Sequence, residues 1–254
     1  MGGRMPDGLV VRAGDPSLVG EAQGLGERLG APVVDAVPTS DECLSLVVSA
    51  DGLCLRRGNM SLSADLTRML PRLRRSNLSR ELLVRAARIR GDGPRTAFDA
   101  TAGLGEDSLL LAAAGFEVTL YERDPVVYEL LADGLRRAAA VPGLAEAVGR
   151  MKARRGDSVS ALGELDAAPD VVLLDPMFPE RRKSASVKKK LQMIQRLERP
   201  CEDEASLLSA ALGAHPRKVV IKRPAKGPWL AGSKPSYTVE GKAIRYDVIV
   251  PPFA

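Results

Sequence analysis

The segment DATAGLG, residues 99–105, constrains the fold of this chain more than any other feature. It follows a short strand-like stretch at residues 96–98 and leads into an apolar helical run at residues 108–114. Glycine lets the backbone turn sharply and approach a ligand, so a strand, a glycine-rich turn and a helix are typical of nucleotide-binding α/β folds. We therefore expect a cofactor site at this turn, lined by Asp99, Gly103 and Gly105.

Strand and helix patterns alternate from this turn onward. The predicted strands are centred near Ala97, Val118, Met151, Val172 and Val219. The predicted helices are centred near Leu110, Glu129, Ala161 and Leu208. This alternation predicts an α/β fold with a doubly wound, mostly parallel sheet. Two further strand patterns, at residues 237–240 and 244–250, predict an antiparallel strand pair at the C-terminal end.

The first part of the chain has a different pattern. Residues 9–12 form a strand candidate, Asp15 and Pro16 are typical of a helix start, and a helix is expected to about Leu29. Strand patterns at residues 44–48 and 53–56 flank Asp51-Gly52 and predict a hairpin. We therefore divide the chain into a small α+β region, residues 1–90, and an α/β domain, residues 91–254.

The kind of cofactor follows from charge. The second predicted strand ends at Glu122, about 20 residues after the turn, where a carboxylate meets ribose hydroxyls in such folds. A dinucleotide site needs a third glycine where Ser108 stands, and Glu106 and Asp107 would lie beside its pyrophosphate. S-adenosylmethionine (SAM) has no pyrophosphate, and acidic residues favour its sulfonium and amino groups. The pattern favours SAM over a dinucleotide.

The segment DPMFP, residues 175–179, follows the apolar run at residues 171–174. The Asp175 carboxylate and the Pro176 carbonyl can accept hydrogen bonds from both N–H groups of a planar amine, and the Phe178 ring can cover a nucleobase. Such acceptors stabilise the charge that develops when the amine attacks an electrophilic methyl group. The segment therefore indicates methylation of a nucleobase amine, and the alternative is an ordinary strand exit built from turn residues.

The chain resembles the bacterial small-subunit (16S) ribosomal RNA guanine-N2 methyltransferases of the RsmJ type. The resemblance runs from about Asp99 to the C-terminus and lies in the segments DATAGLGEDSLLLAAAGFEVTLYERDPVVYELLADGL, DVVLLDPMFPERRKSASVKK and VVIKRPAKGP. It implies a class I, Rossmann-like methyltransferase fold, SAM as the methyl donor and a guanine near the 3′ end of small-subunit RNA as the acceptor. It also implies cofactor contacts at Glu106, Asp107, Glu122, Arg123, Asp157, Ser158 and Asp175.

Positive charge supports an anionic partner. The net charge is +5, which alone is a mild indication. One basic run, between Arg68 and Arg90, lies before the glycine turn, and we leave open whether it is a solvated helix face or an RNA contact. A second run follows the DPMFP loop, where it could track phosphates beside the acceptor. The expected RNA contacts are Arg181, Arg182, Lys183, Lys188, Lys189, Lys222 and Arg223.

Several other classes of protein are disfavoured. The chain has a single histidine, His215, and three scattered cysteines, so we expect no metal site, disulfide framework or histidine-based hydrolase. It also has no apolar run of roughly 18 residues, so we expect no membrane span and a cytoplasmic location.

The sequence thus predicts SAM-dependent methylation of guanine N2 in small-subunit ribosomal RNA, either naked or in an assembled subunit. Methylation of another planar amine, adenine N6 or a glutamine amide, is the alternative within the same chemistry. A noncatalytic RNA-binding assembly factor is the alternative outside it. The oligomeric state is left open.

Overall fold

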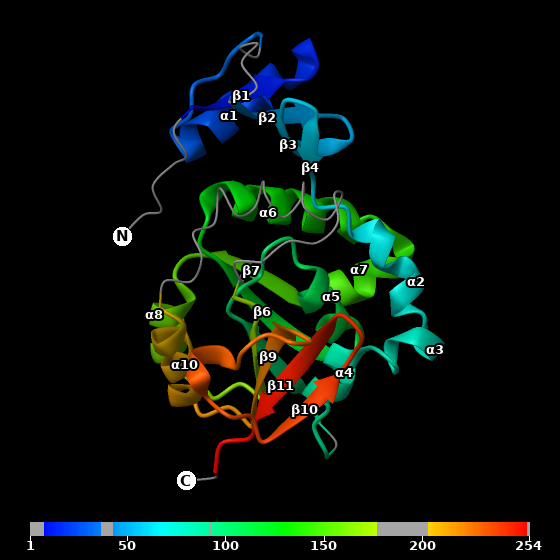
Figure 1. Ribbon diagram of the computed structural model, residues 1–254. Coiled ribbons are helices and arrows are strands. Elements are labelled where there is room, and N and C mark those ends of the chain that lie inside the picture. Colours follow the sequence, from blue (N-terminus) through cyan, green and yellow to red (C-terminus); the bar gives the residue numbers. More distant parts are fainter. Residues whose placement is uncertain (1–7, 37–42, 92, 177–202, 253–254) are drawn as a thin grey trace.

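The computed structural model describes residues 8–36, 43–91, 93–176 and 203–252. These residues form a four-stranded sheet in the order β1-β2-β3-β4 and a seven-stranded sheet in the order β10-β11-β9-β8-β5-β6-β7. Figure 1 shows the smaller sheet at one end of the molecule, with the long helix α6 (Pro125–Ala139) between it and the larger sheet.

The smaller sheet agrees with the expected α+β pattern. Asp15 accepts a hydrogen bond from the Ser17 backbone N–H and so begins the short helix η1, which leads directly into α1. The predicted hairpin is confirmed, since β2 and β3 pair antiparallel. The elements are β1 (Leu9–Ala13), η1 (Pro16–Leu18), α1 (Val19–Leu29), β2 (Leu44–Ser49), β3 (Gly52–Arg57) and β4 (Met60–Leu62).

The larger sheet confirms the predicted doubly wound arrangement. Its five parallel strands are β5 (Arg95–Asp99), β6 (Phe116–Glu122), β7 (Met151–Arg155), β8 (Val171–Leu174) and β9 (Lys218–Pro224). The two C-terminal strands, β10 (Tyr237–Glu240) and β11 (Ile244–Ile249), form the expected antiparallel pair, and β11 also runs antiparallel to β9.

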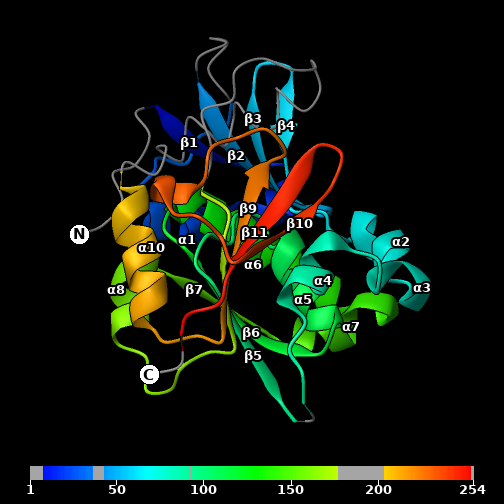
Figure 2. The same cartoon turned by 60° about the horizontal axis from the view of Figure 1, so that its bottom comes forward.

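Helices cover both faces of this sheet, which explains why its central strands are apolar without interruption. Figure 2 shows α4 (Leu82–Ala87), α5 (Glu106–Ala113) and α7 (Pro142–Gly149) on one side, and α8 (Ser158–Gly163) and α10 (Glu204–Gly213) on the other. A hydrophobic core lies on each face of the sheet. Successive residues of β8 alternate between these two cores, because side chains along a strand point to opposite faces. The first core contains Val171 and Leu173, and the second contains Val172 and Leu174.

The smaller sheet packs on α6 through a shared hydrophobic cluster. Leu46 and Leu55 of the sheet belong to the same cluster as Val127 and Leu130 of α6. The Asp133 carboxylate of α6 also accepts a hydrogen bond of 2.9 Å from the backbone N–H of Leu53. Apolar burial and a hydrogen bond therefore join the two parts of the chain.

The segment between the two sheets forms the short elements η2 (Leu66–Met69), α2 (Leu70–Leu73), α3 (Arg75–Leu78) and α4. Its buried side chains, including Met69, Leu83 and Ala86, belong to the core of the larger sheet. These helices therefore pack with the α/β part of the molecule, whereas the division of the chain at residue 90 remains a prediction.

The contact between α6 and the chain after β4 depends on Gly134. A Cβ atom at this position would lie 2.5 Å from Ala64 Cβ and 2.8 Å from Ala64 O, so Gly134→Ala must push the two segments apart. Overpacking costs about 1–3 kcal/mol, which outweighs the gain in helix propensity of about 1 kcal/mol. We expect Gly134→Ala to lower the free energy of unfolding in urea.

Gly24→Ala in α1 is the matched control, because its Cβ would meet only Arg28 Nη1 at an ordinary 3.7 Å. This change should raise the free energy of unfolding by up to about 1 kcal/mol. Equal stabilisation by both substitutions would contradict the close packing of α6.

Candidate active site

The candidate site lies at the carboxyl edge of the seven-stranded sheet, where β5 and β8 are neighbours. The chain winds from β5 toward β6 in one direction and from β8 toward β9 in the other. Parallel α/β sheets bind ligands at such a switch point. Asp99 ends β5, Glu122 ends β6 and Asp175 follows β8, so three carboxylates predicted from the sequence meet at this edge.

Asp99 organises the glycine-rich turn. Its side chain is buried, and its carboxylate accepts hydrogen bonds from Thr101 N at 3.0 Å and from Ser108 Oγ at 2.6 Å. Burial raises the pKa of Asp99 to about 6, because an apolar surrounding disfavours its charge. Asp99 therefore joins the end of β5 to the first turn of α5.

The two glycines of the turn have different tasks. Gly103 and Gly105 both have positive φ, at 52° and 81°, a region that side chains rarely tolerate. A Cβ at Gly105 would lie 2.7 Å from Leu131 Cδ1, so close packing requires glycine there. A Cβ at Gly103 would have no atom within 4 Å. The open space beside Gly103 fits a cofactor that approaches the backbone.

Glu122 connects the glycine turn to the end of β6. Its two carboxylate oxygens accept hydrogen bonds from Gly103 N at 3.0 Å and from Asp124 N at 2.7 Å. Burial raises the pKa of Glu122 to about 7, although these backbone donors favour the ionised form. Each carboxylate oxygen can accept a second hydrogen bond, so Glu122 fits a ligand hydroxyl.

The remaining expected cofactor contacts are Arg123, which follows β6, and Asp157 and Ser158, which follow β7. Gly156 N donates to Glu122 O at 3.0 Å, which joins the end of β7 to the end of β6. Asp157 is the N-cap of α8 and accepts from Ser160 N at 3.3 Å, while Ser158 is buried and Arg123 is exposed. Together with the glycine turn, the ends of three strands therefore supply the expected cofactor residues.

Lys222 has a role that sequence reasoning missed. Its ammonium group donates to Asp107 Oδ2 at 2.7 Å and to Asp175 Oδ2 at 2.8 Å. Asp107 lies in the first turn of α5, where the helix dipole also favours a negative charge, as it does for Glu106. Lys222 therefore links the expected cofactor edge to the expected acceptor loop.

The charges of this ion triad reinforce one another. Burial lowers the pKa of Lys222, but Asp107 and Asp175 raise it more, so the lysine stays protonated. Partial burial raises the pKa of Asp175, and the positive charge of Lys222 opposes that rise. The lysine was expected to contact RNA, yet its charge is directed at two carboxylates instead of a phosphate.

Strand register could have revealed this triad. Leu174 of β8 pairs with Ile221 of β9, so the next residues, Asp175 and Lys222, lie side by side. On the other side of β9, Tyr246 of β11 pairs with Lys222. Burial, followed by the charge of Asp107, raises the pKa of Tyr246, so its hydroxyl stays neutral.

Thr101 was also missed, and Arg72 lies in the basic run whose role the sequence left open. Thr101 Oγ1 accepts a hydrogen bond of 2.7 Å from the backbone N–H of Asp175, which fixes the start of the acceptor loop against the glycine turn. Arg72 of α2 donates to both carboxylate oxygens of Glu81, at 2.8 and 2.7 Å. These hydrogen bonds raise the pKa of Arg72, and the charge of Asp107 adds to the effect.

The structure corrects the expectation for Arg223. Its side chain is fully buried, at 0% exposed, and its guanidinium donates to Pro228 O at 2.9 Å and to Glu204 Oε1 at 3.2 Å. Arg223 follows Lys222 in a strand, so the two side chains point to opposite faces. Arg223 ties β9 to α10 and has no access to an RNA phosphate.

Other expected residues lie outside the part of the chain that the structure describes. Asp175 and Pro176 are the last described residues of the acceptor segment. The expected residues beyond them are Phe178, Arg181, Arg182, Lys183, Lys188 and Lys189.

No cluster of three or more histidine, cysteine, aspartate or glutamate residues in the described parts of the chain could hold a metal ion. Among the helices in residues 8–36, 43–91, 93–176 and 203–252, none is long and apolar enough to cross a membrane.

Comparison with known proteins agrees with this geometry. A family model described as "Putative SAM-dependent methyltransferase" matches residues 34–251. The chain is 40% identical to ribosomal RNA small subunit methyltransferase J of Thioalkalivibrio sulfidiphilus over 250 residues, which cover 95% of this chain and 97% of the relative. It is 48% identical to the protein of the same name from Pseudomonas aeruginosa over 159 residues, 62% and 60% of the two chains.

A solved structure gives the same result. The crystal structure of a SAM-dependent methyltransferase from Neisseria gonorrhoeae matches with a TM-score of 0.71 at 30% identity, covering 96% of each chain. This likeness confirms the methyltransferase fold expected from the sequence. The chain therefore belongs to the SAM-dependent methyltransferases, in the family that includes the ribosomal RNA small subunit methyltransferases J.

Proposed function

We propose that this enzyme transfers a methyl group from SAM to the exocyclic N2 of a guanine in small-subunit ribosomal RNA. The names of the relatives supply the RNA class, and the RsmJ-type resemblance supplies the atom. The observation that carries the mechanism is the position of Asp175, at the switch point of the sheet and bonded to Lys222.

The residues at the ends of β5, β6 and β7 fit the donor. Glu122 would accept from the ribose hydroxyls, and the exposed Asp157 could accept from the adenine amino group. The acidic side chains of Asp99, Glu106 and Asp107 make this edge favourable for a cationic ligand. When bound there, SAM supplies a methyl group on a positively charged sulfur.

The acceptor amine would bind at the DPMFP segment. The Asp175 carboxylate and the Pro176 carbonyl would accept its two N–H hydrogen bonds, and the Phe178 ring would cover the base. Such acceptors localise the nitrogen lone pair and stabilise the positive charge that develops during an in-line transfer. The guanine must leave its stack to reach this edge.

Lys222 would hold the acceptor carboxylate in its active form. Burial raises the pKa of Asp175, and the ammonium opposes that rise and fixes Oδ2, which leaves Oδ1 to accept from the amine. Because the same ammonium binds Asp107, it sets the acceptor loop relative to α5 and the cofactor edge. Lys222 is thus a positioning residue in this proposal.

The first test removes the acceptor carboxylate. Asp175→Ala should reduce methyl transfer to unmodified small-subunit ribosomal RNA by at least about 100-fold, because the developing charge loses its stabilising partner. Radiolabel from SAM incorporated into RNA measures the effect, and thermal unfolding checks the fold. Asp166→Ala, at an exposed carboxylate, is the matched control and should retain activity. Near-normal transfer by Asp175→Ala would contradict the proposed role of this carboxylate.

A second test concerns the charge of Lys222. Lys222→Met should slow transfer and move the acidic limb of the pH–rate profile upward by roughly one unit, since loss of a nearby cation raises a carboxyl pKa. Lys222→Arg keeps the charge and should leave that limb near its wild-type position. If Lys222→Met raises only the KM for RNA and leaves the pH profile unchanged, the lysine is a phosphate contact.

A third test uses the raised pKa of Glu122, about 7. Hydroxyl donors stabilise the ionised form, so SAM binding should lower this pKa and release a proton. The affinity for SAM should therefore rise by about threefold to tenfold from pH 6 to pH 8. Calorimetry in buffers of different ionisation enthalpy measures the released proton. Glu122→Gln should bind SAM more weakly and release less proton, and equal release would contradict the assignment.

A further inference from the structure

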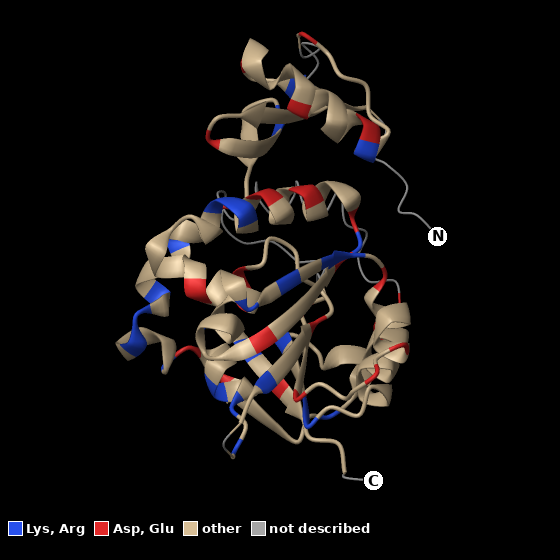
Figure 3. Ribbon diagram, turned by 180° about the vertical axis from the view of Figure 1, so that it is seen from behind, with Lys and Arg blue, Asp and Glu red and all other residues tan. Residues whose placement is uncertain are grey.

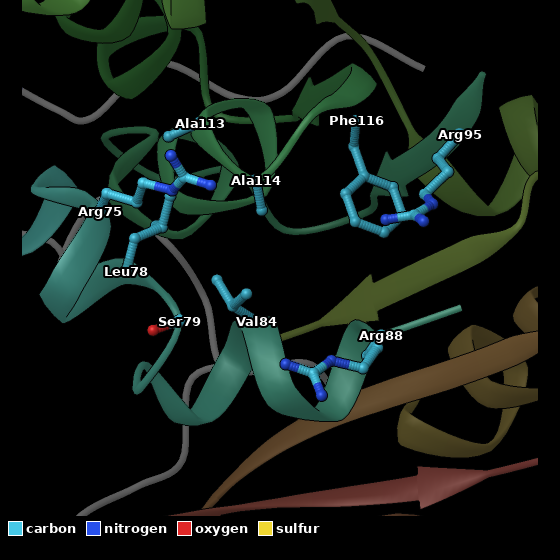
Figure 4. A pocket seen from close by; sticks show the side chains of 9 residues that line it. All are labelled: Arg75, Leu78, Ser79, Val84, Arg88, Arg95, Ala113, Ala114 and Phe116. Carbon is cyan, nitrogen blue, oxygen red and sulfur yellow. The ribbon is translucent and has the colours of Figure 1, made fainter. Parts of the chain in front are cut away.

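A second concave site lies away from the proposed active site. It is a pocket of about 310 Å³ between the α2–α4 segment and the start of β6. Figure 4 shows apolar side chains in its middle and arginines around it, with Arg75 on one side, Arg95 on the other and Arg88 below. Its lining residues are Arg75, Leu78, Ser79, Val84, Arg88, Arg95, Ala113, Ala114 and Phe116.

The pocket is positively charged, and none of the described residues that line it is acidic. Arg75 and Arg88 are exposed, and no ion pair or hydrogen bond of their side chains is found with other described residues. Arg95 donates a hydrogen bond of 3.2 Å to the nearby Gly91 O. Guanidinium groups bind phosphate oxygens in a bidentate manner, and an apolar floor suits the face of a sugar or base. This combination fits a nucleotide unit.

The position of the pocket indicates a long ligand. Arg95 and Phe116 are the first residues of β5 and β6, and they are paired in the sheet. Asp99, at the opposite end of β5, lies four residues later, or roughly 13 Å along the strand. The pocket and the carboxylates therefore lie at opposite edges of the sheet. A single nucleotide cannot occupy both, whereas an RNA chain can.

One segment of the chain connects the two sites. The α2–α4 segment supplies five of the lining residues, and it also carries Arg72, whose pKa responds to Asp107. Figure 3 shows blue Lys and Arg positions on this part of the ribbon. Arg72 belongs to the same basic run as Arg75 and Arg88, the run that the sequence left open as either a solvated face or an RNA contact.

We infer that this pocket is a second RNA-binding site, which holds a phosphodiester segment of the substrate while the acceptor guanine lies at Asp175. The inference rests on the proposed function, because the same RNA must reach both edges of the sheet. It assigns Arg75 and Arg88 to phosphate contacts and the partly exposed apolar side chains of Leu78 and Val84 to the sugar or base.

The test separates RNA binding from methyl transfer. The double variant Arg75→Gln/Arg88→Gln should weaken binding of unmodified small-subunit ribosomal RNA by about tenfold or more, and should reduce the slope of log K against log salt by about 1 to 2. SAM affinity and kcat at saturating RNA should remain at wild-type values. The KM for RNA should rise with the dissociation constant.

Matched controls distinguish RNA binding at this pocket from a general effect of positive surface charge. Arg56→Gln/Lys152→Gln removes two exposed positive charges elsewhere and should have a much smaller effect. Ser79→Glu should weaken RNA binding, because it adds a negative charge to the pocket. Ser79→Gln adds a side chain of the same size as Glu without the charge, and should not weaken binding. Equal losses in the pocket and control variants, or unchanged affinity and salt slope in the pocket variant, would overturn the inference.

The wild-type protein keeps this test independent of the proposed function. If it binds the RNA and loses affinity on the arginine changes, yet transfers no methyl group to this RNA or to assembled small subunits, the pocket stands and the proposed function fails. If it methylates the RNA while the pocket variants bind and react normally, the proposed function stands and the pocket fails.

Discussion

The structure depends on one interaction, the insertion of the Lys222 ammonium group between the carboxylates of Asp107 and Asp175. The glycine-rich turn, α5, β6 and β8 bring acidic side chains to one edge of the sheet, where like charges repel. The partly buried ammonium of Lys222 balances Asp107 and Asp175 at short range, and its two hydrogen bonds fix the relative positions of two elements. Loss of one partner would leave an uncompensated charge, which is costly in a partly buried place.

The proposed chemistry uses this balance. A methyl donor with a positive sulfur and an acceptor that becomes positive during transfer both need negative charge nearby. The carboxylates that supply it must remain ionised despite burial, which raises the pKa of both Asp99 and Glu122. Backbone donors favour the ionised form of Glu122, and the ammonium of Lys222 favours that of Asp175, so each of these two acids has a partner that opposes the effect of burial.

The sequence predicted the sheet well because its signals are local. Alternating apolar runs, the glycine turn and the strand ends at Asp99, Glu122 and Asp175 all lie within short segments. Predictions that depended on tertiary structure were weaker. Lys222 and Arg223 are neighbours with the same charge, yet the strand places one in the site and buries the other against Glu204. The α2–α4 segment belongs to the first 90 residues, which the sequence pattern grouped as one region, and its buried side chains pack in the core of the larger sheet.

The proposed methylation of guanine N2 can be checked by identifying the methylated atom. Unmodified small-subunit ribosomal RNA and assembled small subunits would each be treated with the enzyme and radiolabelled SAM, followed by digestion and nucleoside analysis with site mapping. We expect label as N2-methylguanosine at a single position in at least one of the two acceptors. Label on another nucleoside, or no transfer to either acceptor by a protein that binds SAM, would contradict the proposed methylation.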